Sequence, residues 1–300
     1  MRNPLSTFWD GRGFDFLLVG IPLLFLLAIS GAALLYNVLM SFQQVDIFSL
    51  GAFIRPWAGL ANYRAILSDP NFWLIVKNTA IFVVGSIAGQ FAIGFGLALF
   101  FQLRFAGSSY LRGLFLVSWV MPALVTGAIW NWLLAGDFGV VNYVLNALGI
   151  VDHNIFWRSD PTYALWSVVI ANIWFGTSFN MILLSVGLAS IPADLYEAAA
   201  LDGASPLRRF FTITLPMMRS TIGALISLGL IFTLQQFDLF AALTDGGPSN
   251  ASNVTQYWAW QLSFREYDFS RGATVSVLMI LVVIVASIVY VRSTRHEVRG

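Results

Sequence analysis

The sequence predicts an all-α integral membrane protein with six transmembrane helices. Hydrophobic residues make up 58% of the 300 positions and charged residues only 10%. A water-soluble domain carries roughly 25% charged residues, so lipid is the solvent that fits this composition. Six stretches of the chain are also long and apolar enough to cross a bilayer, for which a helix needs about 20 mostly apolar residues.

Each span is placed on one of these apolar runs. The six spans are Phe16–Met40, Phe72–Phe101, Gly113–Ala135, Tyr163–Leu188, Met217–Leu243 and Gly272–Val291. The first span also resembles a signal peptide, because Arg2 and Arg12 precede it and Ala28-Ile29-Ser30 fits a cleavage site. Its apolar run extends well beyond the roughly 7–15 residues of a signal core. We therefore expect an uncleaved first helix.

The spans also define the segments between them. Residues 1–15 form an N-terminal segment, 16–40 the first helix, 41–71 an outer loop, 72–291 a core of five helices, and 292–300 a C-terminal tail. A further short helix is expected in an outer loop at Phe138–Leu148. If both termini lie inside, the inner segments hold ten of the 16 Lys and Arg residues and the outer segments hold six. Because basic residues favour the cytoplasmic side, we expect both termini in the cytoplasm.

Several kinds of site are disfavoured. The net charge of +1 gives no basic footprint for nucleic acid. Cysteine is absent, which excludes disulfides and thiolate chemistry, and the two histidines, His153 and His296, lie far apart. The phosphate-binding pattern G-x-x-x-x-G-K-[ST] does not occur in the sequence, so no nucleotide site is expected in this chain. An intramembrane enzyme would need a partner for Asp238, and the sequence shows none at membrane depth.

The segment 191–216, between spans four and five, predicts a helix–turn–helix at the inner membrane surface. Pro192 stands near the start of a helix, where its missing N–H costs nothing. Asp194 and Glu197 lie in the first turns, where negative side chains interact favourably with the helix dipole. Gly203 then provides a turn, and Pro206 opens a second helix. Such a compact element fits a groove on another protein.

The residues of this segment resemble a known motif. Glu197-Ala198-Ala199, then Gly203, then Ile213-Thr214-Leu215-Pro216, resemble the EAA loop of binding-protein-dependent ABC importer permeases. The whole string 191–216 resembles the carbohydrate-uptake branch, of the maltose and glycerol-phosphate permease type. Further likenesses to that branch are Gly59–Tyr63 with Lys77-Asn78-Thr79, and Phe237-Asp238 with Thr244–Pro248. Ser220, Asp245 and Phe175 depart from the residues usual in that branch.

The resemblance implies the fold of a type I ABC importer permease, with a cytoplasmic coupling helix that docks onto an ATPase subunit. It implies as partners a second homologous permease, two ATPase subunits and an extracytoplasmic solute-binding protein, in the inner membrane of a prokaryote. ATP and Mg²⁺ would be bound by the ATPase subunits, with no cofactor in this chain. The residues that match the coupling motif are Glu197, Ala198, Ala199, Asp202, Gly203 and Pro216.

The path of the solute should be lined by polar residues within spans, since polar groups facing lipid are costly. The candidates are Asn172, Trp174, Asn180, Gln235, Gln236 and Asp238. Amides bind hydroxyl groups and aromatic faces stack on sugar rings, so a sugar or polyol is favoured. The same amides also fit hydrogen bonding between helices.

Every Lys and Arg lies in a loop or near a span end, which favours a neutral solute. Glycerol phosphate or a related phosphodiester stays open, because the second permease could supply the charge. A channel or secondary carrier is the other rival, and it would need no EAA-type helix.

Overall fold

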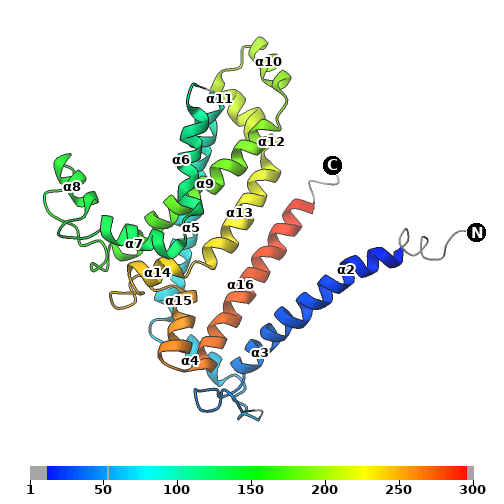
Figure 1. Cartoon of the computed structure of the whole chain (residues 1–300), viewed down its shortest axis with the longest axis vertical. Coiled ribbons are helices and arrows are strands. Elements are labelled where there is room, and N and C mark those ends of the chain that lie inside the picture. The colour runs from blue at the N-terminus through cyan, green and yellow to red at the C-terminus, as the bar shows by residue number, and fades with distance from the viewer. Residues whose placement is uncertain (1–11, 53, 104, 296–300) are drawn as a thin grey trace, which may run out of the picture. The chain divides into compact units, whose positions relative to one another are not determined.

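The computed structural model describes residues 12–52, 54–103 and 105–295, and within these ranges the chain consists of helices and loops without a strand (Figure 1). It divides into two compact units: residues up to 68 with 259–278, and residues 69–258 with those from 279 on. Four described helices are long and apolar enough to cross a membrane, or up to six if each of two bent pairs is one span. The second count agrees with the predicted six spans and the all-α class.

The first predicted span forms one continuous helix with a π-helical turn in the middle. It consists of α2 (Arg12–Leu26), the π-helical turn η1 (Leu27–Gly31) and α3 (Ala32–Ser41). The short helix α4 (Ala61–Leu67) is fixed to its end. Asn62 Nδ2 donates to the carbonyls of Ser41 and Gln43, both at 2.9 Å, and the Tyr63 hydroxyl lies 2.8 Å from Ser41 Oγ. The Asn62 amide thus satisfies the carbonyl of Ser41, which the helix end leaves unpaired, and that of Gln43 just beyond it.

Two long helices form the core of the second unit. They are α5 (Phe72–Gln102) and α9 (Ala164–Ala189), and both confirm the predicted second and fourth spans within one residue at each end. Glycines let their backbones approach closely. A Cβ at Gly94 would lie 2.7 Å from the Cβ of Asn180, and one at Gly176 would lie 2.4 Å from Cδ of Gln90. The α5–α9 contact therefore depends on the absence of side chains at these positions.

The third predicted span is wrong as a single helix. The chain forms α6 (Ser108–Val120) and α7 (Ala123–Leu133), which are bent by 100° at the break between them. Pro122 causes the break, since proline disfavours the helical conformation of the residue before it, and Met121 is extended with φ −67° and ψ 141°. Asn131 Nδ2 on α7 then donates to the carbonyl of Ala242 at 2.8 Å.

The fifth predicted span, Met217–Leu243, also runs across a break. α13 (Arg219–Leu234) ends before Gln235, and α14 (Asp238–Leu243) is a separate short helix. The carbonyl of Gln235, released by the helix end, accepts a hydrogen bond of 2.6 Å from Gln256 Nε2. At its other end α13 follows α11 (Pro206–Arg209), η2 (Phe210–Thr214) and α12 (Leu215–Met217) with a bend of 67°. The π-helical turn and Pro216 explain that bend.

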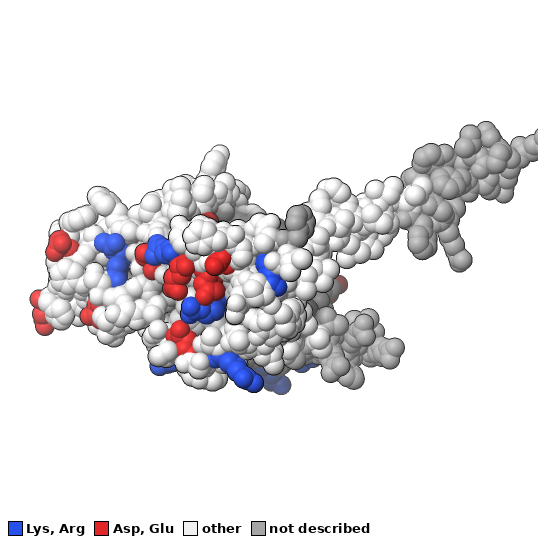
Figure 2. Space-filling view, turned by 90° about the horizontal axis from the view of Figure 1, so that it is seen from below, with Lys and Arg blue, Asp and Glu red and all other residues white. Residues whose placement is uncertain are grey.

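The remaining elements are α8 (Val140–Ala147), α10 (Ala193–Leu201), α15 (Thr255–Trp260), η3 (Gln261–Arg265) and α16 (Phe269–Arg295). α8 confirms the predicted short helix of that loop, and α16 contains the sixth predicted span and extends beyond it at both ends. Figure 2 shows small groups of acidic and basic side chains, of both signs, between uncharged ones on the face that it views. Residues 1–11 of the predicted N-terminal segment 1–15 and residues 296–300 of the predicted tail lie outside the described residues.

Candidate functional site

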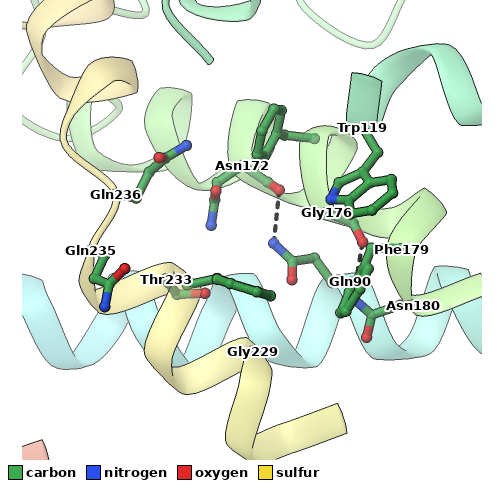
Figure 3. A pocket seen from close by; sticks show the side chains of 12 residues that line it. Gln90, Trp119, Asn172, Gly176, Phe179, Asn180, Gly229, Thr233, Gln235 and Gln236 are labelled. Carbon is green, nitrogen blue, oxygen red and sulfur yellow. Dashed lines mark hydrogen bonds between the residues drawn. The ribbon is translucent and has the colours of Figure 1, made fainter. Parts of the chain in front are cut away.

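A cavity of about 350 Å³ lies among α5, α6, α9 and α13 of the second unit (Figure 3). It is lined by Gln90, Trp119, Asn172, Phe175, Gly176, Phe179, Asn180, Gly229, Phe232, Thr233, Gln235 and Gln236. None of these residues is charged. The break after α13 gives the cavity one of its polar walls, because it turns Gln235 and Gln236 out of helical register.

The amide side chains on two sides of the cavity are held in defined positions. Gln90 Nε2 donates to the carbonyl of Asn172 at 2.8 Å, and its amide lies over Gly176, where any side chain would collide with it. Asn180 Nδ2 donates to the carbonyl of Gly176 at 2.9 Å. These bonds are drawn in Figure 3. Carbonyl acceptors from α9 therefore orient one amide from α5 and one from α9 itself.

Two amide nitrogens at the cavity remain unpaired. Asn172 Nδ2 and Gln236 Nε2 are buried and have no hydrogen-bond partner among the described residues. Leaving a buried donor unpaired costs about 1–3 kcal/mol. The Asn172 amide points from α9 toward the side of the cavity formed by Thr233 and Gln236 (Figure 3). Gln236 also borders a second cavity of only about 10 Å³ beside Gln256. The larger cavity thus offers N–H donors to a ligand that carries oxygen acceptors.

Aromatic rings form the apolar part of the wall. The ring centroids of Trp119 and Phe179 lie 5.3 Å apart, and those of Phe179 and Phe232 lie 5.7 Å apart. Amide donors together with aromatic faces can bind a polyhydroxylated solute, but they cannot perform acid–base or nucleophilic chemistry. No group of three or more His, Asp or Glu residues that could hold a metal occurs in the described part of the chain.

The structure brings four of the six predicted path residues to this cavity and leaves two elsewhere. Asn172, Asn180, Gln235 and Gln236 line it. Trp174 does not, because it faces a separate, mostly apolar groove among α5, α6, α7 and α9 and packs edge-on against Trp130, with ring centroids 6.3 Å apart. Asp238 was expected within an apolar span. Since α13 has already ended at Leu234, Asp238 instead begins α14, where it is exposed and outside the cavity wall.

Sequence reasoning missed several residues of the cavity. Gln90 could have been found, because it is the only Gln, Asn or charged side chain within the middle of α5, between Asn78 and Gln102. Trp119, Phe179 and Phe232 carried no distinguishing signal, since the chain has 26 Phe and 11 Trp residues, most of them in apolar stretches. Their positions depend on how α6, α9 and α13 pack.

The predicted helix–turn–helix is confirmed as a structure. α10 follows Pro192, Gly203 adopts φ +74° in the turn, and the backbone N–H of Arg208 donates to Ser205 Oγ at 3.3 Å at the start of α11. No residue of α10 is buried, and Leu201 is 90% exposed. In Figure 1, α10 lies beyond the end of the α5, α6 and α9 group, at the end opposite α14.

The motif residues of this segment share that exposure. Glu197, Ala198, Asp202, Gly203 and Pro216 are exposed, and Ala199 is half-buried. The helix therefore presents small and acidic side chains outward.

One stretch that resembled the carbohydrate branch, Lys77–Thr79, contacts the loop that comes directly after another, Thr244–Pro248. Asn78 Nδ2 donates to the carbonyls of Asn250, Ala251 and Asn253 at 3.0–3.1 Å. Thr79 Oγ1 accepts from the backbone N–H of Thr255 at 3.0 Å. The start of α5 therefore fixes the loop that follows Thr244–Pro248.

Comparisons with known proteins agree with these features. A family described as the binding-protein-dependent transport system inner membrane component matches residues 81–299. The sulfoquinovosyl glycerol transport system permease protein SmoG of Agrobacterium fabrum is 32% identical over 287 residues, which cover 93% of this chain and 92% of SmoG. The trehalose/maltose transport system permease protein MalF of Thermococcus litoralis is 34% identical over 246 residues, 81% of either chain.

A solved structure supports the fold. A chain of a bacterial ABC transporter involved in the import of the acidic polysaccharide alginate superposes with a TM-score of 0.80 and 20% identity, covering 96% of this chain and 98% of that one. The match of the family over residues 81–299, together with two relatives above 30% identity, decides the family. This chain belongs to the family of binding-protein-dependent transport system inner membrane components, the membrane permease subunits of such transport systems.

Proposed function

We propose that this chain is one of two permease subunits of an ABC importer that moves a sugar or polyol across the membrane by alternating access. The uncharged cavity with amide donors and aromatic walls is the observation that carries the proposal. Hydroxyl and ring oxygens of a sugar accept from the buried amides, and its apolar face contacts the rings of Trp119 and Phe179. The trehalose/maltose permease among the relatives is consistent with this class of solute.

A neutral solute fits the cavity better than an anionic one. Recognition of phosphate or carboxylate relies on Arg or Lys, and neither is among the lining residues. Glycerol phosphate or a related phosphodiester is the alternative. The structurally similar bacterial ABC transporter is involved in the import of an acidic polysaccharide, alginate. An anionic solute would need charge from the second permease, whose cavity wall faces this one in the proposed pair.

Energy for transport would come from two cytoplasmic ATPase subunits, which bind ATP and Mg²⁺, through the docking of α10. Glu197 pairs with a basic residue of the ATPase, while Ala198, Ala199 and Gly203 permit close approach, and Asp202 and Pro216 bound the docking segment. The exposure of this whole face supports the assignment. α10 and both termini then lie in the cytoplasm, and an extracytoplasmic binding protein delivers the solute to the opposite end.

The docking role can be tested by assembly. Glu197→Arg combined with Gly203→Asp should abolish copurification of the ATPase subunits with the tagged permease. Gly149→Asp is the matched control, because Gly149 also has a positive φ, of +66°, with no atom within 4 Å of an added Cβ, as at Gly203. Undiminished assembly and ATP hydrolysis in the double variant would refute the docking role.

The class of solute can be tested on the complex reconstituted in proteoliposomes with its binding protein. Uptake would be measured for maltose, trehalose, glycerol 3-phosphate and an alginate oligosaccharide at equal concentration. We expect uptake of a neutral sugar, driven by ATP, and no uptake of the two anions. Transport of glycerol 3-phosphate alone would favour the alternative.

A further inference from the structure

The docking helix is joined to the rest of the second unit by few side chains. α10 contains no buried residue. Tyr196 is half-buried, and its hydroxyl lies 2.8 Å from Oγ1 of Thr214, with which it shares a hydrogen bond. Thr214 is 4% exposed and belongs to the π-helical turn η2. The contact therefore connects the exposed helix to a buried position 18 residues further along the chain.

The ring of Tyr196 also contacts a buried apolar cluster. The cluster consists of Phe95, Ala98, Leu184, Leu188, Ile191, Met218 and Leu225, with Tyr196, Phe210, Ile213 and Ile222 among the side chains packed against it. Apart from Tyr196 itself, these residues come from α5, α9, η2 and α13 and from the connections at Ile191 and Met218. Because a packed cluster of this kind is only slightly compressible, a displacement of Tyr196 is transmitted to the helices that supply it.

One of these helices leads to the cavity. Met218, which is fully buried, precedes α13, and Leu225 lies in its first half. The second half of the same helix carries Gly229 and Thr233, both in the cavity wall. Thr214 and Thr233 are therefore linked by the bend at Met218 and a single uninterrupted helix.

We propose that Tyr196 is a positioning residue whose hydrogen bond to Thr214 makes α13 follow the movement of α10, so that ATP binding by a partner changes the shape of the cavity. This inference rests on the proposed function of α10 as the docking helix. Without the bond, α10 still docks on the ATPase, but its movement is only partly conveyed to η2 and α13. The bond thus acts on coupling and not on assembly.

The absence of cysteine from the chain makes a direct measurement practical. In the purified complex with both ATPase subunits, Thr233→Cys reports the cavity through its rate of reaction with a small maleimide, with and without ATP and Mg²⁺. We expect ATP to change this rate. Adding Tyr196→Phe or Thr214→Val should reduce the ATP-dependent change in labelling rate by roughly two- to tenfold, the effect of one neutral hydrogen bond. Because both substitutions remove the same bond, the two together should reduce it no more than either alone.

Tyr63→Phe is the matched control, because it removes a Tyr hydroxyl that shares a hydrogen bond of the same 2.8 Å with Ser41, in the first unit. It should leave the ATP response at residue 233 unchanged. The proposal would be overturned if Tyr196→Phe left the ATP-dependent change in labelling rate at its full size. It would also be overturned if the double substitution reduced that change by the product of the two single effects. Failure of the proposed docking would be distinguishable, since the ATPase subunits would then be missing from the complex before any labelling began.

Discussion

α9 and α10 are separated by only three residues and differ in almost every physical respect. Fourteen of the 26 residues of α9 are buried, and it contributes five side chains or backbone positions to the cavity wall. α10 has nine residues and none is buried. A short helix that its own chain covers only in part, at Tyr196 and Ala199, gains stability if another molecule packs against its exposed face. α9 is therefore an internal element, and α10 is an exposed element, which we propose to dock on a partner.

The largest expected effect concerns the internal helix. Gly94→Val places a branched side chain against Asn180, where the first Cβ alone would approach to 2.7 Å. Overpacking of this kind costs about 1–3 kcal/mol or more, so the unfolding temperature of the purified protein in detergent should fall by several degrees. Gly96→Val on the same helix is the control, since nothing lies within 4 Å of its Cβ. Equal unfolding temperatures would show that α5 and α9 do not pack as described.

For the exposed helix α10 we predict the opposite result, in which partner binding is lost and stability is kept. Leu201→Arg changes a side chain that is 90% exposed, so stability should change by no more than about 0.5 kcal/mol. The amount of ATPase that copurifies should nevertheless fall, by about tenfold if Leu201 anchors the contact. A loss of stability with unchanged copurification would contradict the difference between α9 and α10.

A third prediction separates function from stability within α9 itself. Asn172→Leu removes a buried, unpaired amide nitrogen, so the folded state should be as stable as the natural protein or more so. The KM for uptake should rise by roughly two- to tenfold, as expected from the loss of one hydrogen bond to the solute.

Asn142→Leu is the contrasting variant. Asn142 donates to the carbonyls of Gly136 and Ile155 and accepts from Trp157 Nε1 at 2.9 Å. Its replacement should lower the unfolding temperature. If Asn172→Leu destabilised the protein to the same extent, its amide would have to be regarded as structural.

The smallest expected effect lies outside both helices, in the loop after α3. The hydroxyl of Ser49, and then its backbone N–H, hold the pKa of Asp46 below its ordinary value of 3.8. Because the pKa is lowered in the folded state, the bonds are intact above the ordinary pKa and are lost as the pH falls through the lowered value. Asp46→Ala should speed amide exchange at Phe48 and Ser49 at neutral pH, and the difference from the natural protein should vanish at acid pH. Asp160→Ala should not affect these amides.

The helical structure of α10, the proposed docking helix, could be predicted from the sequence because its signals are local. Pro192, Gly203 and Ser205 determine where the two helices begin and where the turn falls, and each acts through its own backbone or a neighbour within three residues. Long apolar runs likewise predicted α5 and α9 almost to the residue, since their length is set by the membrane.

The cavity could be predicted only in part. Four of its amides were expected from polarity alone, but the way they come together depends on the end of α13 at Leu234. The polar residues Gln235, Gln236 and Asp238 mark that place in the sequence, but they were interpreted as polar positions within one continuous span. The sharp bend at Pro122 was missed for a related reason, because the apolar run continues through it. Hydropathy therefore located membrane segments but not the breaks within them.

The central claim is that α10 faces the cytoplasm and is covered there by an ATPase subunit. Leu201→Cys in this cysteine-free chain can be exposed to a membrane-impermeant maleimide in intact cells and in inside-out vesicles, before and after removal of the ATPase subunits. We predict labelling only in inside-out vesicles from which the ATPase has been removed, and its suppression when the ATPase is added back. Labelling in intact cells, or labelling that the ATPase does not reduce, would contradict the claim.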